Sequence, residues 1–125
     1  MLPCWLNQFQ IMTSNEQLIS DFYTAFKNRD AEKMVANYSD DVEFTDPAFG
    51  NLKGTEAKDM WRMLCQSSGD IKIDFQITSA KDNLVTAHWD AEYTFSKTGR
   101  RVRNAIDAHF TIENGRITAH IDSFN

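Results

Sequence analysis

From residue 71 onward, apolar side chains recur at every second position. The alternation covers three segments, namely residues 71–78, 85–95 and 102–112. Successive side chains of a strand point to opposite faces, so this period predicts three strands that each bury one face, and residues 117–124 are expected to form the last strand. Lys97-Thr98-Gly99 and Glu113-Asn114-Gly115 are typical of hairpin turns, and they predict that the last three strands form an antiparallel meander.

The first half of the chain follows a helical period instead. Leu18, Ile19, Phe22 and Phe26 recur at that spacing and predict an amphipathic helix over residues 15–28. The other expected elements are helices over residues 31–38 and 56–67, a strand over 42–46 that Pro47 ends, and an irregular segment over 48–54.

Helices followed by long strands predict an α+β fold, with three N-terminal helices packed on one face of a mostly antiparallel sheet. Long strands twist and curl, so we expect a cone-shaped α+β barrel that encloses a pocket. The 125 residues match one domain, which we place at residues 15–125, with residues 1–14 as a tail or a short packed segment.

The composition argues against several kinds of partner. Thirteen basic and eighteen acidic residues give a formal net charge of -5, and the basic run at residues 100–103 is too short for a nucleic-acid surface. Cys4 and Cys65 lack the spacing of a metal site, so we expect free thiols, no metal and no cofactor. The apolar start of the chain has no basic segment and is too short to span a membrane, which favours a cytoplasmic protein without a membrane partner.

Several short motifs carry a resemblance to a known family. They read LISDFYTAF at residues 18–26, YSDDVEFTDP at 38–47, GTEA at 54–57, TGRR at 98–101, and IENGRI at 112–117 running into HIDSF at 120–124. In this order they resemble the nuclear-transport-factor-two-like, or ketosteroid-isomerase-like, superfamily, and most closely its SnoaL-like (polyketide-cyclase-like) branch. The resemblance spans residues 16–124 and implies a pocket and a homodimer formed through the sheet. The fold hosts isomerases, dehydratases, cyclases, epoxide hydrolases and non-enzymatic binders, so it does not imply one activity.

Asp46 is the first candidate for chemistry. It lies between Phe44 and Phe49, and Pro47 holds it in an extended backbone conformation. In the resembled steroid isomerases, the carboxylate at the matching Asp-Pro position is the general base, and a carboxyl group walled by aromatic side chains suits proton transfer. The alternative is a turn in which Asp46 bonds its own backbone.

The rest of the steroid-isomerase pattern is absent. Its oxyanion hole needs a tyrosine on the first helix and a protonated aspartic acid on the third long strand. The matching positions here are Phe22 and Ala108, which donate no side-chain hydrogen bond. Tyr23 points about 100° away from Phe22 around the helix, and Asp107 faces the other side of its strand. Steroid isomerisation by that mechanism is therefore not expected.

His120 and Asp122 share one face of the last expected strand. Asp122 matches an aspartate that the resembled limonene-epoxide-hydrolase branch uses in acid–base chemistry. The arginine and the second aspartate of that branch fall on Trp89 and Ala91, which argues against epoxide hydrolysis. The pair lines the pocket if the last strand shares the register of the resembled enzymes; the alternative is a pair that faces solvent at a sheet edge.

An apolar sheet face that lines a cavity would surround a few polar groups, as ligand sites do. The residues expected to contact a substrate are Phe22, Tyr23, Phe44, Phe49, Trp61, Trp89, Tyr93, Asn104, Ile106, Ala108 and Phe110. The alternative is that aromatic members such as Trp89 and Phe110 are plain core. The expected ligand is a small hydrophobic molecule.

The opposite face of the sheet is charged. Its residues are His88, Asp90, Glu92, Arg101, Arg103, Asp107 and His109. Cross-strand ion pairs on a solvated or self-associating face explain such a mixture of signs. A metal or catalytic pair of His88 and Asp90 is the alternative, although two ligands are few for a site.

Two functional hypotheses follow. The first is a pocket enzyme, namely an isomerase, dehydratase, cyclase or hydrolase, that uses Asp46 as general acid or base on a small hydrophobic substrate, with His120 or Asp122 assisting. The second is a non-catalytic ligand-binding or dimeric interaction domain. The loss of both oxyanion-hole donors favours the second, because such donors supply much of the transition-state stabilisation.

Overall fold

The computed structural model describes residues 13–67, 69–95 and 98–124. The helices are α2 (Ser14–Lys27), α3 (Ala31–Val35) and α4 (Thr55–Ser67). The strands are β1 (Tyr38–Asp46), β2 (Gly50–Lys53), β3 (Lys72–Lys81), β4 (Leu84–Phe95), β5 (Arg100–Glu113) and β6 (Arg116–Phe124). They form a six-stranded sheet in the order β2-β1-β6-β5-β4-β3. Neighbouring strands are antiparallel except β1 and β6, which are parallel.

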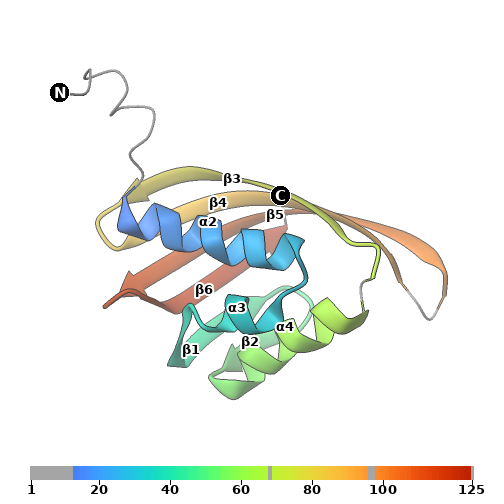
Figure 1. The fold of residues 1–125 in the computed structure, drawn as a ribbon, viewed down its shortest axis with the longest axis horizontal. Coiled ribbons are helices and arrows are strands. Elements are labelled where there is room, and N and C mark those ends of the chain that lie inside the picture. Colours follow the sequence, from blue (N-terminus) through green and yellow to red (C-terminus); the bar gives the residue numbers. More distant parts are fainter. Residues whose placement is uncertain (1–12, 68, 96–97, 125) are drawn as a thin grey trace.

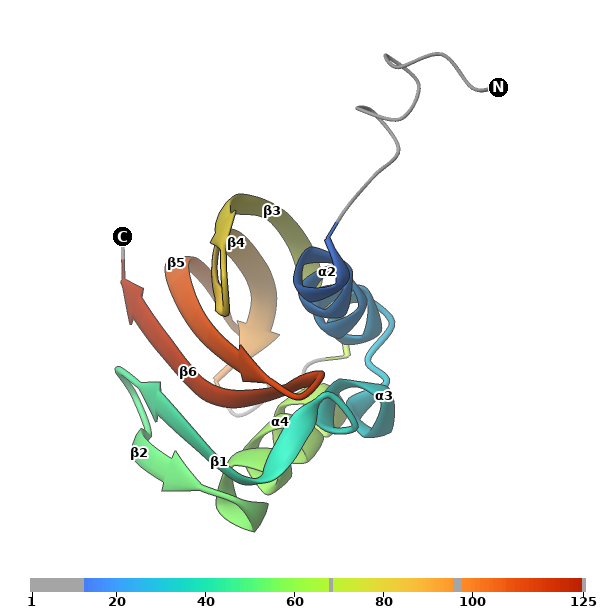
Figure 2. The same cartoon turned by 90° about the vertical axis from the view of Figure 1, so that its left-hand side faces the viewer.

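The sheet curls into an open trough. Figure 2 shows it as an arc from β3 at one edge to β2 at the other, with α2, α3 and α4 across the open side. In Figure 1 these helices cover one face of the sheet, and no described helix lies on the other face. The predicted α+β cone, three helices on a curved and mostly antiparallel sheet, is therefore confirmed.

The core lies between the helices and the concave face of the sheet. On α2 the residues at helical spacing, Ile19, Phe22 and Phe26, are fully buried. The helix begins with a capping box, in which the Thr13 hydroxyl accepts from the Glu16 amide and the Glu16 carboxylate accepts from the Thr13 amide. Burial of each large apolar side chain contributes about 1.5–3 kcal/mol, so the inner face is what holds α2 in place.

Three elements differ from the prediction, and one of them is β1, which begins at Tyr38 rather than at residue 42. Helix α3 ends at Val35 rather than residue 38, because Tyr38 already belongs to β1, where it pairs with Ile117 of β6. Part of the segment expected to be irregular forms β2, which pairs with the end of β1. Gly50 begins this strand with a φ of 78°, a conformation that glycine adopts at little steric cost.

Some predictions concern residues at the start of the chain and in one turn. Residues 1–12, which include Cys4, and Lys97 of the expected hairpin turn lie outside the described residues, so the domain boundary near residue 15 stays a prediction. Cys65 is buried, and its thiol is free. Within the described ranges, no helix has the length and hydropathy needed to cross a membrane.

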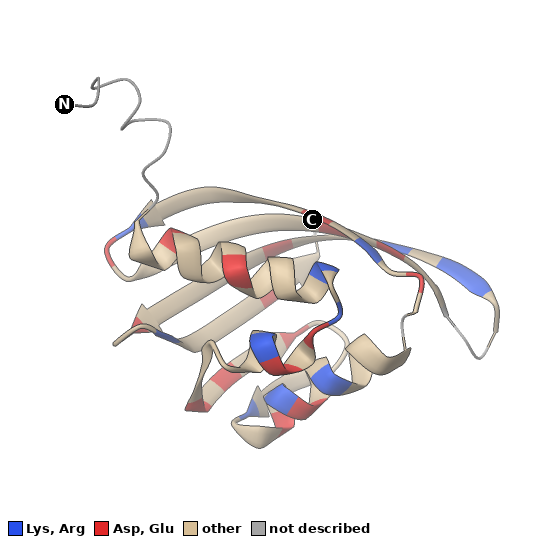
Figure 3. Cartoon of the chain, in the orientation of Figure 1, with Lys and Arg blue, Asp and Glu red and all other residues tan. Residues whose placement is uncertain are grey.

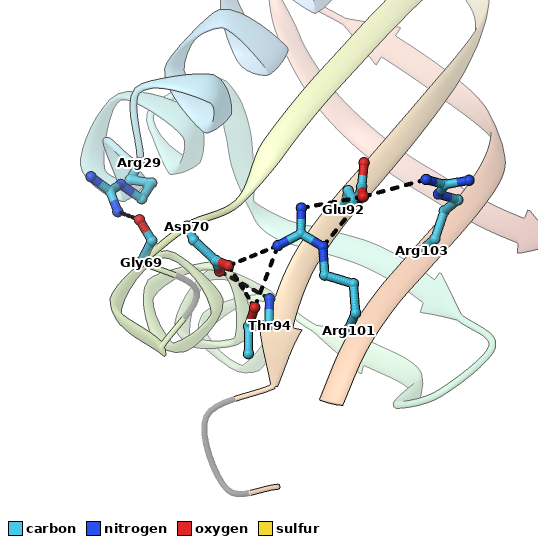
Figure 4. A network of polar contacts seen from close by, with 7 residues as sticks. All are labelled: Arg29, Gly69, Asp70, Glu92, Thr94, Arg101 and Arg103. Carbon is cyan, nitrogen blue, oxygen red and sulfur yellow. Dashed lines mark hydrogen bonds and ion pairs between the residues drawn. The ribbon is translucent and has the colours of Figure 1, made fainter. Parts of the chain in front are cut away.

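The outer face of the sheet carries the predicted cross-strand ion pairs. Arg101 contacts Asp70 and Glu92 at N–O distances of 3.1 and 3.2 Å, and Arg103 contacts Glu92 at 3.3 Å. The amide and the hydroxyl of Thr94 both donate to Asp70, as Figure 4 shows. Figure 3 shows charges of both signs near this end of the sheet and along α3 and α4. The network joins the segment before β3 to the β4–β5 hairpin.

His88 lies on the same outer face. Its Nδ1 is 2.8 Å from the Asp107 carboxylate across the strand pair, and its Nε2 is 3.3 Å from Asp90. These contacts, the bond to Asp107 first, raise the pKa of His88 above its ordinary value. The three residues therefore form an ion-pair cluster in which a charged imidazole lies between two carboxylates. Among the described residues, no three His, Cys, Asp or Glu side chains gather closely enough to hold a metal ion.

We expect His88 to stabilise the fold more at low than at high pH. Because its pKa in the folded protein lies above the ordinary 6.5, the stabilisation is present below that pH and disappears as the pH rises through the raised pKa. His88→Gln should therefore lower the free energy of unfolding more at about pH 5.5 than at about pH 8.5, as urea denaturation would measure. Introducing Asp107→Asn first should shrink this pH dependence. The same loss of stability at both pH values would contradict the prediction.

Gly54 forms a close turn between β2 and α4. Its φ is 53°, and a Cβ added there would lie 2.9 Å from the Asp40 carbonyl oxygen. Gly50 also has a positive φ, of 78°, but open space surrounds an added Cβ. A left-handed alanine costs roughly 1–2 kcal/mol in either place. Gly54→Ala should lose more stability than Gly50→Ala in chemical denaturation, because backbone must also move, and equal losses would show that the close approach has no effect.

Candidate functional site

An apolar pocket opens between α4, the end of β1 and the concave face of the sheet. Its volume is about 100 Å³, whereas most ligand sites have roughly 300–1,000 Å³. Two carboxyl groups, those of Asp46 and Asp122, face this pocket among mostly apolar side chains. A larger depression beside the β5–β6 turn is lined by polar and mostly exposed residues, so the apolar pocket is the candidate site.

A β-bulge in β6 turns two polar side chains toward the interior. The pairing register between β5 and β6 shifts at Thr118, which is an extra residue on β6. Ile117 faces the core before the bulge, and His120 and Asp122 face it afterwards, with exposed fractions of 0% and 4%. Because β6 lies between β1 and β5, the alternative of a solvent-facing pair at a sheet edge is wrong.

A continuous series of hydrogen bonds runs from α4 to the pocket. Nε1 of Trp61 donates to the Tyr38 hydroxyl oxygen at 2.8 Å. The Tyr38 hydroxyl lies 2.8 Å from Nδ1 of His120, and Nε2 of His120 lies 2.8 Å from Oδ1 of Asp122. All four residues are buried, and we refer to them together as the buried polar chain.

The donors and acceptors of the buried polar chain assign its protons. The Tyr38 oxygen accepts from Trp61, so its own O–H donates to Nδ1 of His120. Nε2 then carries the imidazole hydrogen and donates to Asp122. Burial raises the pKa of Tyr38 well above its ordinary value, and the charges of Asp122 and Asp46 add to the rise, although the bond from Trp61 lowers it. Tyr38 is therefore a neutral donor, and Asp122 is the final acceptor.

Aromatic packing fixes the ring of His120. The imidazole stacks between Phe44 and Phe110, with centroid separations of 4.4 and 4.1 Å and interplanar angles of 28° and 27°. Stacking sets the plane of the ring, and the two hydrogen bonds set its rotation within that plane. The position of Asp122 Oδ1 is thus determined by packed groups, which is how precise sites are supported.

Asp46 lies at the rim of the pocket, on the turn from β1 to β2. Its Oδ2 accepts hydrogen bonds from the amides of Ala48 and Phe49, at 2.8 and 2.9 Å. The turn that the sequence offered as an alternative is therefore present. The half-buried Asp46 side chain also lines the pocket, so the turn does not remove this residue from the candidate site.

The two pocket carboxyl groups come from neighbouring parallel strands. The pairing of β1 with β6 places Phe44 opposite His120. Asp46 and Asp122 each follow two residues later on the same face of their strands. The tertiary fold thus brings both aspartates to one pocket from adjacent positions.

Two buried polar atoms at the pocket have no hydrogen-bond partner within the described part of the chain. They are Oδ2 of Asp122 and Nε1 of Trp89, in residues that are 4% and 6% exposed. Buried polar groups are nearly always paired in folded proteins. Two residues that line one pocket therefore carry an unpaired donor and an unpaired acceptor.

One protein-family model matches most of the chain. The model of the SnoaL-like domain matches residues 19–120, from the middle of α2 into β6. The chain belongs to the SnoaL-like domain family. No curated protein matches it.

Solved structures share the fold of this SnoaL-like domain at low sequence identity. A proposed polyketide cyclase from Silicibacter sp. TM1040 is 18% identical, with a TM-score of 0.77 over 91% of this chain and 90% of that one. An LEH-like epoxide hydrolase from M. tuberculosis is 21% identical, with a TM-score of 0.72 over 90% and 84%. SalBIII, an epoxide hydrolase/cyclase-like enzyme of pyran ring formation in salinomycin, is 14% identical, with a TM-score of 0.77 over 89% and 90%.

The structure of the SnoaL-like domain brings many of the predicted site residues together. The predicted residues that line the pocket are Asp46, Phe49, Trp61, Trp89, Tyr93, Asn104, Ile106 and Asp122. Those that do not line it are Phe22, Tyr23, Phe44, Ala108, Phe110 and His120, all of them buried. The rings among them fill the inner part of the cone by packing on one another, as when Phe22 meets Phe110 edge-on at a centroid separation of 5.9 Å.

Sequence reasoning missed the other pocket residues. They are Phe26, Ala48, Met60, Leu64, Ile71, Ala91 and Phe124. Helical spacing or strand alternation marks most of them as inward-facing, but no local signal separates a pocket wall from the core. Tyr38 is the last residue of the helix predicted over residues 31–38, and its bond to His120 could not be foreseen because the two are 82 positions apart.

The positions that match the steroid-isomerase oxyanion hole belong to the core. Phe22 and Ala108 are fully buried and offer no side-chain donor. Tyr23 is also fully buried, and its ring stacks on Phe75 at a centroid separation of 5.2 Å. Asp107 faces the outer surface, as predicted, and contacts His88 there.

Tyr38→Phe should destabilise the domain by about 1–3 kcal/mol, because the Trp61 donor and the His120 acceptor would remain buried without a partner. Urea denaturation would measure the loss. Tyr23→Phe is the matched control, since it removes a buried hydroxyl that has no partner among the described residues. Its stability should stay the same or rise. Equal losses in the two variants would contradict the role of the buried polar chain.

Proposed function

We propose that this SnoaL-like domain is an enzyme that moves a proton on a small hydrophobic substrate, with Asp122 as the principal general acid or base and Asp46 as a second carboxyl group. The observation that carries the proposal is the buried and unpaired Oδ2 of Asp122, a residue that lines the pocket, while Nε2 of His120 lies 2.8 Å from Oδ1. A carboxyl group that is fixed through one oxygen and free at the other suits proton transfer to a bound molecule.

The step begins with a C–H or O–H bond of the substrate beside Oδ2 of Asp122. The proton passes to Oδ2, and the electron pair of the broken bond stays on the substrate, where it forms a new ring bond or double bond to a neighbouring carbon. That carbon releases an electron pair in turn, either the π pair of its C=C or C=O bond or the pair that joined it to a leaving group. The proton then returns from Oδ2 to the atom that holds the released pair. His120 keeps its bond to Oδ1 throughout and so holds the orientation of Asp122. Asp46 offers its oxygen that is not bound to the turn amides to a polar end of the substrate at the rim.

Isomerase, dehydratase or cyclase chemistry fits these groups better than epoxide hydrolysis does. The resembled hydrolases use an arginine and a second aspartate where this chain has Trp89 and Ala91. Neither an indole nor a methyl group can act as a general base on water. The names of two structural neighbours, a proposed polyketide cyclase and a cyclase-like enzyme, are consistent with this choice.

A non-catalytic ligand-binding domain is the second candidate. It is favoured by the small pocket volume, about 100 Å³, and by the absence of donors at Phe22 and Ala108. In that case, the two aspartates bind a polar group of the ligand without moving its proton. In either case, we expect two copies of the chain to pair through the outer face of the sheet, as the family resemblance implies.

The probe 5-nitrobenzisoxazole tests proton transfer without knowledge of the natural substrate. A base that removes its ring C–H proton breaks the N–O bond and releases a coloured cyanonitrophenolate. The parent protein should accelerate this reaction roughly 10²-fold or more over an equal concentration of acetate. Asp122→Asn should lower the rate to that of acetate, and Asp46→Asn should lower it less.

Asp90→Asn is the matched control, because this aspartate is exposed on the opposite face and should not affect the pocket. Turnover by Asp122→Asn at the parent rate would contradict the proposed role of Asp122. If the parent gives no acceleration although the probe binds, the ligand-binding domain is the better description.

A further inference from the structure

Trp89 and Asp122 project from different strands into the same small pocket. Trp89 lies on β4 and Asp122 on β6, both on the concave face of the sheet. Each side chain is more than nine-tenths buried, and each keeps one polar atom without a partner among the described residues. The buried polar chain does not use either atom, because it ends at Oδ1 of Asp122.

The two unpaired atoms have complementary requirements. The Trp89 indole N–H can only donate a hydrogen bond, and the free oxygen of the Asp122 carboxylate can only accept one. A single ligand group that pairs with both atoms must accept a hydrogen bond from the indole and donate one to the carboxylate. A hydroxyl does so with one oxygen, whereas an ether or ketone leaves the carboxylate unpaired, and an ammonium group leaves the indole unpaired. A ligand carboxylate would face the charges of Asp46 and Asp122.

The remaining walls define what the hydroxyl must be attached to. Apolar side chains such as Met60, Leu64 and Ile106 line the same pocket as Trp89 and Asp122, so the body of the ligand is hydrophobic. Phe49 and Phe124 also line the pocket but are 49% and 62% exposed, so they form its mouth. A compact ring can therefore place a hydroxyl at the inner end and extend outward between these two side chains.

We propose that the ligand of this pocket is a small alcohol or phenol, whose hydroxyl accepts from Nε1 of Trp89 and donates to Oδ2 of Asp122. The inference deepens the proposed function, since it rests on the same pocket and names the substrate class. It also assigns a role to Trp89: the indole orients the O–H bond toward the base. Trp89 is thus a specificity-determining residue at the position where the resembled hydrolases carry arginine.

Three probes of similar shape test the hydroxyl requirement. Phenol can accept and donate, anisole can only accept, and toluene can do neither. Titration of the full chain, followed by the indole N–H signals in ¹H–¹⁵N NMR spectra, gives both the affinity and the contact. Phenol should bind at least about tenfold more tightly than anisole or toluene, since loss of a buried bond costs about 1.4 kcal/mol or more. The Trp89 signal, assigned by its loss in Trp89→Phe, should shift with phenol.

Two variants separate the two bonds. Trp89→Phe should reduce the preference for phenol over toluene several-fold, because both probes lose the same apolar contacts and only phenol loses a hydrogen bond. In Asp122→Asn, the side-chain oxygen should still accept from His120, so the amide N–H₂ group replaces the free oxygen. That variant should lose the preference for phenol over anisole, because the new group donates where the carboxylate accepted. Circular dichroism of both variants checks that they are folded.

Equal affinities of the parent for the three probes would overturn the inference. It would also fail if Trp89→Phe bound phenol as tightly as the parent, because the indole N–H would then make no bond to the hydroxyl. These outcomes are distinct from those of the benzisoxazole assay. Proton transfer with equal affinities would refute only the hydroxyl requirement, and selective phenol binding without proton transfer would refute only the catalytic proposal.

Discussion

Polar atoms that are removed from water must bond to one another, and in this domain that requirement joins three elements at His120. Trp61 of α4, Tyr38 of β1 and Asp122 of β6 meet there in one series of hydrogen bonds. Each bond left unmade in such a place costs about 1–3 kcal/mol. The helix beside the pocket and two strands at the centre and margin of the sheet are therefore held in one mutual arrangement, and the pocket depends on it.

The candidate site lies where the buried polar chain ends, at Asp122, because Oδ2 of this residue has no partner among the described residues. His120 cannot itself touch a ligand, because Phe44 and Phe110 cover both faces of its ring and its two nitrogens are engaged. In the proposed function it acts through Asp122, whose second oxygen is left unpaired in the described part of the chain. On that proposal His120 is a positioning residue, and Asp122, Trp89 and Asp46 are the polar residues of the pocket that would contact a bound molecule.

Much of the fold could be predicted because its signals are local. The alternation along β4 and β5 is uninterrupted, so the apolar and charged faces came out correctly, with Trp89 inside and His88 outside. Asn114 and Gly115 adopt the positive φ values, 52° and 75°, that the hairpin turn requires. Short motifs sufficed for the family. The helix predicted over residues 31–38 is longer than α3, which ends at Val35. The prediction differs because a five-residue helix followed by a strand places apolar residues at nearly the same spacing as one longer helix.

By itself, the sequence determined the period of each element, the turns between them and the family, since all of these depend on neighbouring residues. Only the tertiary structure decided that His120 and Asp122 face inward, because strict alternation from Ile117 would point them outward, and the bulge at Thr118 reverses it. The parallel pairing of β1 with β6, which brings Asp46 and Tyr38 to that face, also joins residues far apart in the chain. Such pairings are chosen by the packing of the whole sheet, and no local pattern records them.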